Sequence, residues 1–168
     1  MPQTYEPIET KTLDTAVSSV TFISIPATYT DLVLIANSST TTVGSSEINK
    51  MTFNSDAGTN YSTTTLAGNG SSAASFRASS QTYIRAGRST ANGDSYFVLN
   101  KIQIMNYANT TTFKTALAQG PEANAYLETE VGLWRSTSAI TSVTLTAGSN
   151  NYKVGSTFAL YGIKAANG

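Results

Sequence analysis

The sequence contains no cysteine and no histidine. A disulfide, a Cys–His catalytic pair and a Ser-His-Asp triad therefore cannot form, and the common zinc ligand sets are missing. Charge is also scarce, because ten basic residues balance ten acidic ones and charged residues make up only 12% of the chain. A neutral chain lacks the basic surface that drives binding to phosphates, so we expect no nucleic-acid partner.

Long apolar runs and chemical motifs are missing as well. No run of about 18 apolar residues occurs, so we expect no membrane span, and the N-terminal MPQTYEPIETK lacks the basic and apolar regions of a secretory signal. The glycine-containing AGNGSS lacks the lysine and the following helix of a phosphate-binding loop. Glu128 and Glu130 lie on one strand face, which we expect to point outward, and are not predicted to form a glycosidase pair.

The turn NSDAGTN around Asp56 offers oxygen atoms for calcium but does not match an EF-hand, so a plain turn is the preferred interpretation. Trp134 either stacks on a sugar ring or belongs to the core or its rim. With no catalytic pattern in view, we predict that the protein is not an enzyme and needs no cofactor and no metal.

Serine and threonine are abundant and together account for 48 of the 168 residues. Threonine, tyrosine, phenylalanine and valine favour strands, whereas serine, asparagine and glycine favour turns. Short apolar or alternating runs recur between turn signals roughly every ten residues, which is typical of sandwiches and jelly rolls. We therefore predict an all-β fold, an antiparallel β-sandwich of jelly-roll type with about eight to ten strands, and one short helix at residues 113–119.

The length of the chain fits one domain with a core of its own. We predict a single β-sandwich domain over residues 13–168, preceded by an extended N-terminal arm over residues 1–12, because Pro2 and Pro7 disfavour helix. DLVLIAN (31–37) and TFALYGI (157–163) are apolar on both sides and are predicted to be central strands, with Phe158 buried.

The segment from 68 to 93 is long, polar and carries three of the four arginines. It is either an edge strand with solvated loops or a projecting region that contacts a partner. The candidate partner-binding residues fall in this segment and in the arm, and they are Pro2, Tyr5, Pro7, Arg77, Tyr83, Arg85 and Arg88.

Three stretches together carry a family resemblance: SSVTFISIPATYTDLVLIANS, VGLWRSTSAITSVTLTAGS and STFALYGIK. They resemble a family of small virion proteins of tailed bacteriophages, common among phages of cyanobacteria and other aquatic bacteria, and the likeness spans most of residues 5–164. The shared motifs are structural. The resemblance implies a β-sandwich protein on the outer surface of the virion.

This resemblance leads to two functional expectations. The first is a capsid decoration or cement protein that stabilises the head by contacts with the major capsid protein. The alternative is a tail-fibre or receptor-binding module that contacts tail proteins or host surface glycans. We expect a homo-oligomer, and a trimer would match the three-fold positions of a capsid. The arm would add main-chain hydrogen bonds to a capsid subunit, and the arginines would bind acidic loops beside Tyr83.

Overall fold

The computed structural model describes residues 5–41, 47–89, 97–122 and 126–164, which contain twelve strands and no helix. The strands are β1 (Tyr5–Thr12), β2 (Ser19–Phe22), β3 (Asp31–Ser38), β4 (Glu47–Phe53), β5 (Tyr61–Gly68), β6 (Ala73–Gln81), β7 (Ile84–Ser89), β8 (Val98–Met105), β9 (Lys114–Glu122), β10 (Tyr126–Trp134), β11 (Val143–Ala147) and β12 (Thr157–Ile163).

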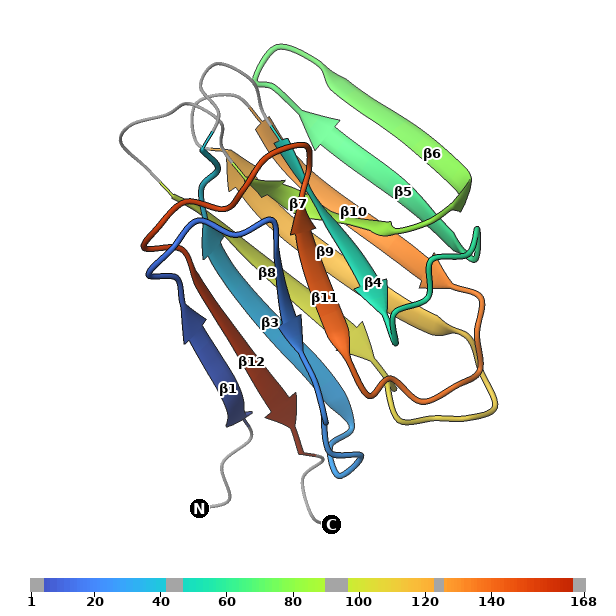
Figure 1. Ribbon diagram of the computed structural model, residues 1–168. Helices are drawn as coiled ribbons and strands as arrows, with labels where there is room; N and C mark the ends of the chain where they lie inside the picture. The colour runs from blue at the N-terminus through green and yellow to red at the C-terminus, as the bar shows by residue number, and fades with distance from the viewer. Residues whose placement is uncertain (1–4, 42–46, 90–96, 123–125, 165–168) are drawn as a thin grey trace.

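The strands form two antiparallel sheets, and Figure 1 shows the smaller sheet lying in front of the larger one. The larger sheet has eight strands in the order β1-β12-β3-β8-β9-β10-β5-β6, and the smaller has four in the order β2-β11-β4-β7. The prediction of an all-β antiparallel sandwich is confirmed. The jelly-roll type is not confirmed, because a jelly roll distributes eight strands over two sheets.

The core lies between the two sheets and is built from the inward-facing residues, which alternate with outward-facing ones along each strand. Phe158 of β12 is fully buried and packs against Tyr152, with ring centroids 4.9 Å apart. Its predicted burial is therefore confirmed, and β3 and β12 are interior strands as expected. The second apolar side of β12 is only half-buried, at Ala159 and Tyr161, because the smaller sheet covers one face of the larger sheet.

The segment expected to be an arm forms β1, an edge strand of the protein's own sheet. It is extended, as predicted, and pairs with β12 from Tyr5 opposite Ile163 to Thr12 opposite Thr157, with an irregularity between Pro7 and Glu9. One edge of β1 is thus already paired with β12 of the same chain. This pairing extends the sheet, and Ile8 packs against the core. Pro2 lies outside the described residues.

The prediction of a helix at residues 113–119 is wrong, because residues 114–119 belong to β9, between β8 and β10. Ala116 and Ala118 alternate into the core there, so tertiary packing outweighs the helix propensity of alanine. Lys114 is buried at the start of the strand, and its Nζ donates to the carbonyl oxygens of Thr112 (2.7 Å) and Thr137 (3.2 Å).

The β5–β6 hairpin extends beyond the smaller sheet and lies at the upper right in Figure 1. β6 forms the last strand of the larger sheet. All of its residues are exposed except Ala78 and Gln81, which are half-buried, so both faces of this strand meet solvent. The arginine-rich segment is therefore divided, with Arg77 on β6 in one sheet and Arg85 and Arg88 on β7 in the other.

Candidate partner-binding region

β10 faces the opposite way from the prediction. Glu128 and Glu130 are each only 1% exposed, whereas Leu127 is 66% exposed and Val131 is 47% exposed. The expectation that the two glutamates point outward is therefore wrong. They face the smaller sheet, where β7 lies across β10.

Both buried glutamates are paired with arginines from β7. Arg88 donates to the two carboxylate oxygens of Glu128 through Nε and Nη2, each at 2.8 Å. Arg85 donates through Nε to Glu130 Oε1 at 2.9 Å. The fork of the Arg88 guanidinium matches the planar carboxylate of Glu128, and such charge-assisted bonds are the stronger kind. Arg85 makes a single bond to Glu130, and its Nη2 lies 3.6 Å from Glu128 Oε2. The network links the two sheets at the side of the core.

The glutamates lie inside because β7 is an edge strand of the smaller sheet and its outer main-chain groups need partners. The N–H of Gly87 donates to Glu130 Oε2, and the N–H of Arg85 donates to Thr63 Oγ1 at 3.1 Å. Asn100 accepts from the N–H of Arg88 (3.2 Å) and donates to its carbonyl (2.7 Å). Side chains of the larger sheet thus close this edge.

Two features of the closed edge show how tightly it is built. Gly87 has a φ of 80°, and a Cβ there would lie 2.0 Å from Asn100 Oδ1, so only glycine fits. Burial raises the pKa of Glu130, while the Gly87 N–H and Arg85 oppose that rise. Glu130 therefore accepts hydrogen bonds from β7, from the Gly87 N–H and from Arg85 Nε, in the interior of the protein.

The candidate residues do not form one patch. Arg85 and Arg88 are half-buried and are paired with the buried glutamates. Arg77 is exposed on β6 and makes no ion pair among the residues that the structure describes. Tyr83 is half-buried, and Lys50 Nζ lies 5.3 Å from the centroid of its ring. Tyr5 and Pro7 are exposed on β1, at the opposite edge of the larger sheet from Arg77.

Trp134 is a core residue and offers no face to a sugar. It is 2% exposed, and its ring stacks on Tyr61 with centroids 6.2 Å apart. Its Nε1 donates to Asp56 Oδ2 at 2.7 Å, and Asp56 also accepts from the N–H of Gly58 at 2.8 Å. The bond from Trp134 is the main reason why the pKa of Asp56 lies below its usual value.

No group of three or more Asp or Glu side chains able to hold a metal occurs within the described ranges.

Sequence reasoning missed an apolar area on the outward face of β5 and β10. Leu66, Leu127 and Val131 are all exposed there on neighbouring strands, because Leu66 is opposite Thr129 and Leu127 is opposite Gly68. A shallow depression of about 240 Å³ opens beside Leu66 and Leu127, and it is lined by Leu66, Ala67, Gly68, Ala73, Leu127 and Thr129. The alternation along β10 indicated which residues share a face but not that this face is outward.

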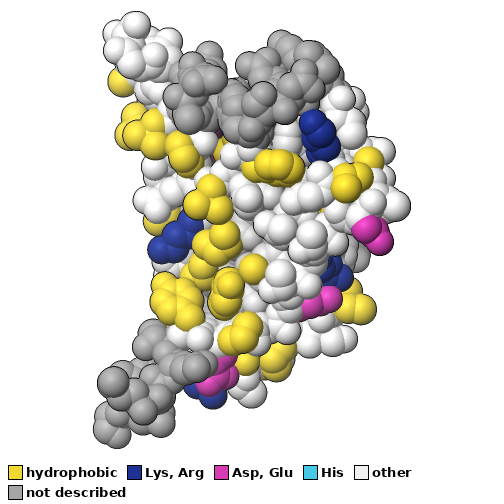
Figure 2. Space-filling model, turned by 90° about the vertical axis from the view of Figure 1, so that its left-hand side faces the viewer, with side chains coloured by type: hydrophobic (Ala, Val, Ile, Leu, Met, Phe, Trp, Pro, Cys, Tyr) yellow, Lys and Arg dark blue, Asp and Glu magenta, His cyan; other side chains and the backbone are white. Residues whose placement is uncertain are grey.

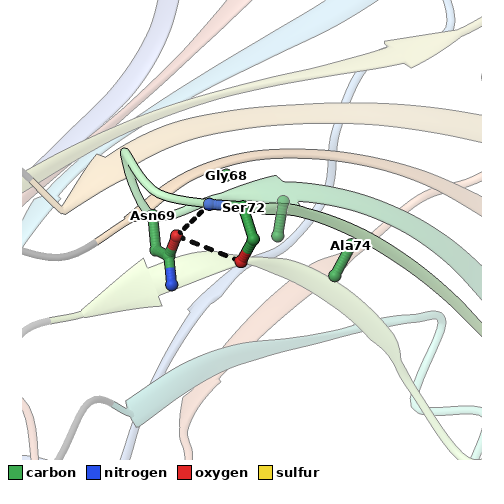
Figure 3. Close-up of a pocket in the computed structure, with 5 residues that line it drawn as sticks. Gly68, Asn69, Ser72 and Ala74 are labelled. Atoms are coloured by element: carbon green, nitrogen blue, oxygen red, sulfur yellow. Dashed lines mark hydrogen bonds between the residues drawn. The ribbon is translucent and has the colours of Figure 1, made fainter.

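A second, smaller hollow of about 50 Å³ lies at the β5–β6 turn (Figure 3) and is lined by Ala67, Gly68, Asn69, Ser72 and Ala74. Asn69 Oδ1 accepts from the N–H and the hydroxyl of Ser72, at 2.8 and 3.3 Å, and this holds the turn. Both hollows are smaller than the roughly 300 Å³ typical of small-molecule sites. A macromolecular contact fits this region better than a small ligand does.

The surface on the β1 side of the molecule, away from these hollows, is largely uncharged. Figure 2 shows the side of the molecule on which β1 lies in Figure 1, and uncharged side chains predominate there, with few charged ones among them. This agrees with the 12% charged residues of the sequence.

Fold and site together define a two-sheet antiparallel β-protein with a sealed edge at β7, an open edge at β6 and an apolar outward face beside it. Comparisons with protein-family models, with curated proteins and with solved structures found no match to this chain. The phage-family resemblance therefore stays a prediction. Over the described residues, no helix is long and apolar enough to cross a membrane.

Proposed function

We propose that the protein is a structural component of a tailed-phage virion, a decoration or cement protein on the outer surface of the head. In this proposal it stabilises the head through contacts with the major capsid protein and carries out no catalysis. The observation that carries the proposal is the exposed apolar area formed by Leu66, Leu127 and Val131. Contiguous exposed apolar side chains on an otherwise polar surface are typical of protein–protein contact sites.

Three further observations support this proposal. The family resemblance covers stretches that form interior strands, namely β3 and β12. The ionic groups of β7 and β10 are engaged in holding the two sheets together. The uncharged, hydroxyl-rich composition suits a protein that binds another protein surface.

The receptor-binding alternative rests on the polar loops and on Trp134, and it loses the second of these because Trp134 is buried and cannot stack on a glycan. It therefore enters only as an outcome of the experiment below. We also propose a homo-oligomer. A trimer would match three-fold capsid positions, whereas the β6 pairing argued below gives a dimer, and a mass measurement in solution decides between the two.

The test is binding of the purified protein to phage heads that lack it, followed by quantification against the major capsid protein. We expect hundreds of copies per particle. Leu127→Ser combined with Val131→Ser should reduce binding at least tenfold without unfolding the protein, because both side chains are exposed. Ile23→Ser is the matched control, since Ile23 is equally exposed but follows β2 of the other sheet.

Two results would contradict the proposal. A few dozen copies located on tails, or binding to host cells with no binding to heads, would favour the receptor-binding module. Equal head binding by the double variant and by the Ile23→Ser control would show that the outward face of β10 is not the contact.

A further inference from the structure

No strand in the described ranges pairs with the outer edge of β6, and this edge lacks the features that usually block strand addition. At the opposite edge of the same sheet, β1 carries Pro7, an irregularity beside Pro7 and several charged side chains, all of which discourage pairing. β6 contains no proline, and Arg77 is its one charged residue. Its pairing with β5 is regular from Ala73 to Ala78, so its other side presents a regular row of main-chain groups.

The sequence of this regular stretch is complementary to itself. It runs Ala73, Ala74, Ser75, Phe76, Arg77, with two small residues on one side of Ser75 and two large ones on the other. We propose that two copies of the chain pair antiparallel through β6, with Ser75 opposite Ser75 of the second copy. This register places Arg77 opposite Ala73 and Phe76 opposite Ala74, so large side chains meet small ones on both faces.

On the outward face, the hollowed surface fits this register. Gly68 is opposite both Ala73 and Leu127, so the three residues form one row across β6, β5 and β10. The same three residues line the depression of about 240 Å³. Arg77 of the second copy continues this row, and its aliphatic stem covers the depression while its guanidinium stays in water.

On the inward face, Phe76 of the second copy continues the row formed by Ala74 and Ala67. Both alanines line the smaller hollow of about 50 Å³, and Figure 3 shows the side chain of Ala74 beside it. Phe76 is 42% exposed within one chain. Arg85 Cζ of the same chain lies 5.1 Å from the centroid of its ring, and pairing brings the remaining exposed part of the ring toward the two alanines of the other copy.

The smaller sheets leave room for this contact. β6 extends past the smaller sheet (Figure 1), so the two smaller sheets stay apart when the larger sheets join edge to edge. The joined sheet would also present the outward apolar face twice. The pairing does not depend on attachment to a capsid, and the experiments below contain no capsid, so the two proposals can fail separately.

A single cysteine tests the register, because the natural chain has none. Directly opposite residues of antiparallel strands have Cα atoms about 4.5–5.5 Å apart, which is within the range for a disulfide. We expect Ser75→Cys to form a disulfide-linked dimer under mild oxidation, measured by non-reducing electrophoresis, at least tenfold faster than two control variants.

The first control is Thr64→Cys, exposed on β5 but three strand spacings across and four residues along the strands from its copy, about 19 Å. The second is Arg77→Cys, whose copy lies four residues away along the strands, about 13 Å. Cross-linking of Ser75→Cys no faster than that of Thr64→Cys would overturn the pairing. Faster cross-linking of Arg77→Cys would overturn the register.

The mass in solution gives a second, independent test. We expect the unmodified protein to sediment as a dimer and Ala74→Lys to sediment as a monomer, because a lysine at this exposed position would meet Phe76 of the second copy. Ser79→Lys adds the same charge outside the paired stretch and should remain dimeric. A monomer or a trimer for the unmodified protein, or equal effects of the two lysines, would refute the proposal.

Discussion

Replacing Glu130 by alanine tests whether the buried ionic network holds β7 against the larger sheet. The change removes the acceptor of the Gly87 N–H and of Arg85 Nε, which lies 2.9 Å away, and it leaves both donors in a largely buried place. Loss of one partner of a buried ion pair costs about 3–5 kcal/mol. Against a total unfolding free energy of about 5–15 kcal/mol for a typical domain, this loss would be large.

Glu130→Gln separates the main-chain contact from the charge. The glutamine oxygen can still accept from Gly87, while the attraction to Arg85 is lost, so we expect a smaller destabilisation of about 1–2 kcal/mol. The order of stability should therefore be wild type, then Glu130→Gln, then Glu130→Ala.

The assay is urea unfolding at pH 7, followed by circular dichroism and by the fluorescence of Trp134. Glu6→Ala serves as the control, because Glu6 forms an exposed pair with Lys164 and should change stability little. A Glu130→Ala variant that loses less than about 1 kcal/mol would refute the assigned role, since one unsatisfied buried donor alone costs about that much.

Three other changes have definite expected outcomes. Gly132→Ala should destabilise the protein by about 1–3 kcal/mol in urea unfolding, because the new Cβ would lie 2.2 Å from Ile84 Cγ2. This loss of stability should be smaller in an Ile84→Ala background, where that atom is absent. Asp56→Asn should make the free energy of unfolding depend less on pH at the acid end. Folding lowers the pKa of Asp56, so this carboxylate stabilises the protein above its unfolded pKa of 3.8, and the stabilisation is lost as the pH falls through its folded pKa. A profile unchanged between pH 2 and 5, measured as thermal unfolding, would contradict this assignment. Phe158→Asp should abolish folding, seen as loss of the β-sheet circular dichroism spectrum, because an unpaired charge would enter the core.

The sequence predicted strands better than it predicted their orientation. Alternation correctly separated Leu127 and Val131 from Glu128 and Glu130, because side chains on a strand alternate with period two. It assigned the wrong set to the interior, since hydropathy alone favours burying leucine and valine. The requirement that reverses this choice, the unpaired edge of β7, arises only when β7 and β10 come together.

Local composition misled the sequence reading at β9 as well. The alanines of residues 113–119 suggest a helix, and only the neighbouring strands β8 and β10 make the extended form favourable. Apolar stretches such as DLVLIAN were easier to place, because a run apolar on both sides suits an interior strand wherever it lies in the sheet. The outward area around Leu66 could not be predicted, since it depends on which strands the smaller sheet leaves uncovered.

The position of β12 has a consequence for how the molecule folds. This strand lies between β1 and β3, so the first strand of the described chain pairs only with the last one. During synthesis, β1 and one edge of β3 therefore wait without partners until residue 163 has been made. Closing contacts over so long a stretch of chain is entropically slow, and proteins dominated by such pairings fold in milliseconds to seconds.

While it waits, the edge of β3 exposes the apolar run LVLI, which is a hazard for association with other nascent chains. Pro7 protects β1 in this interval, because a proline-containing segment pairs poorly with the wrong partner. We therefore expect the yield of correctly folded protein to depend on temperature and on the rate of synthesis more steeply than on equilibrium stability.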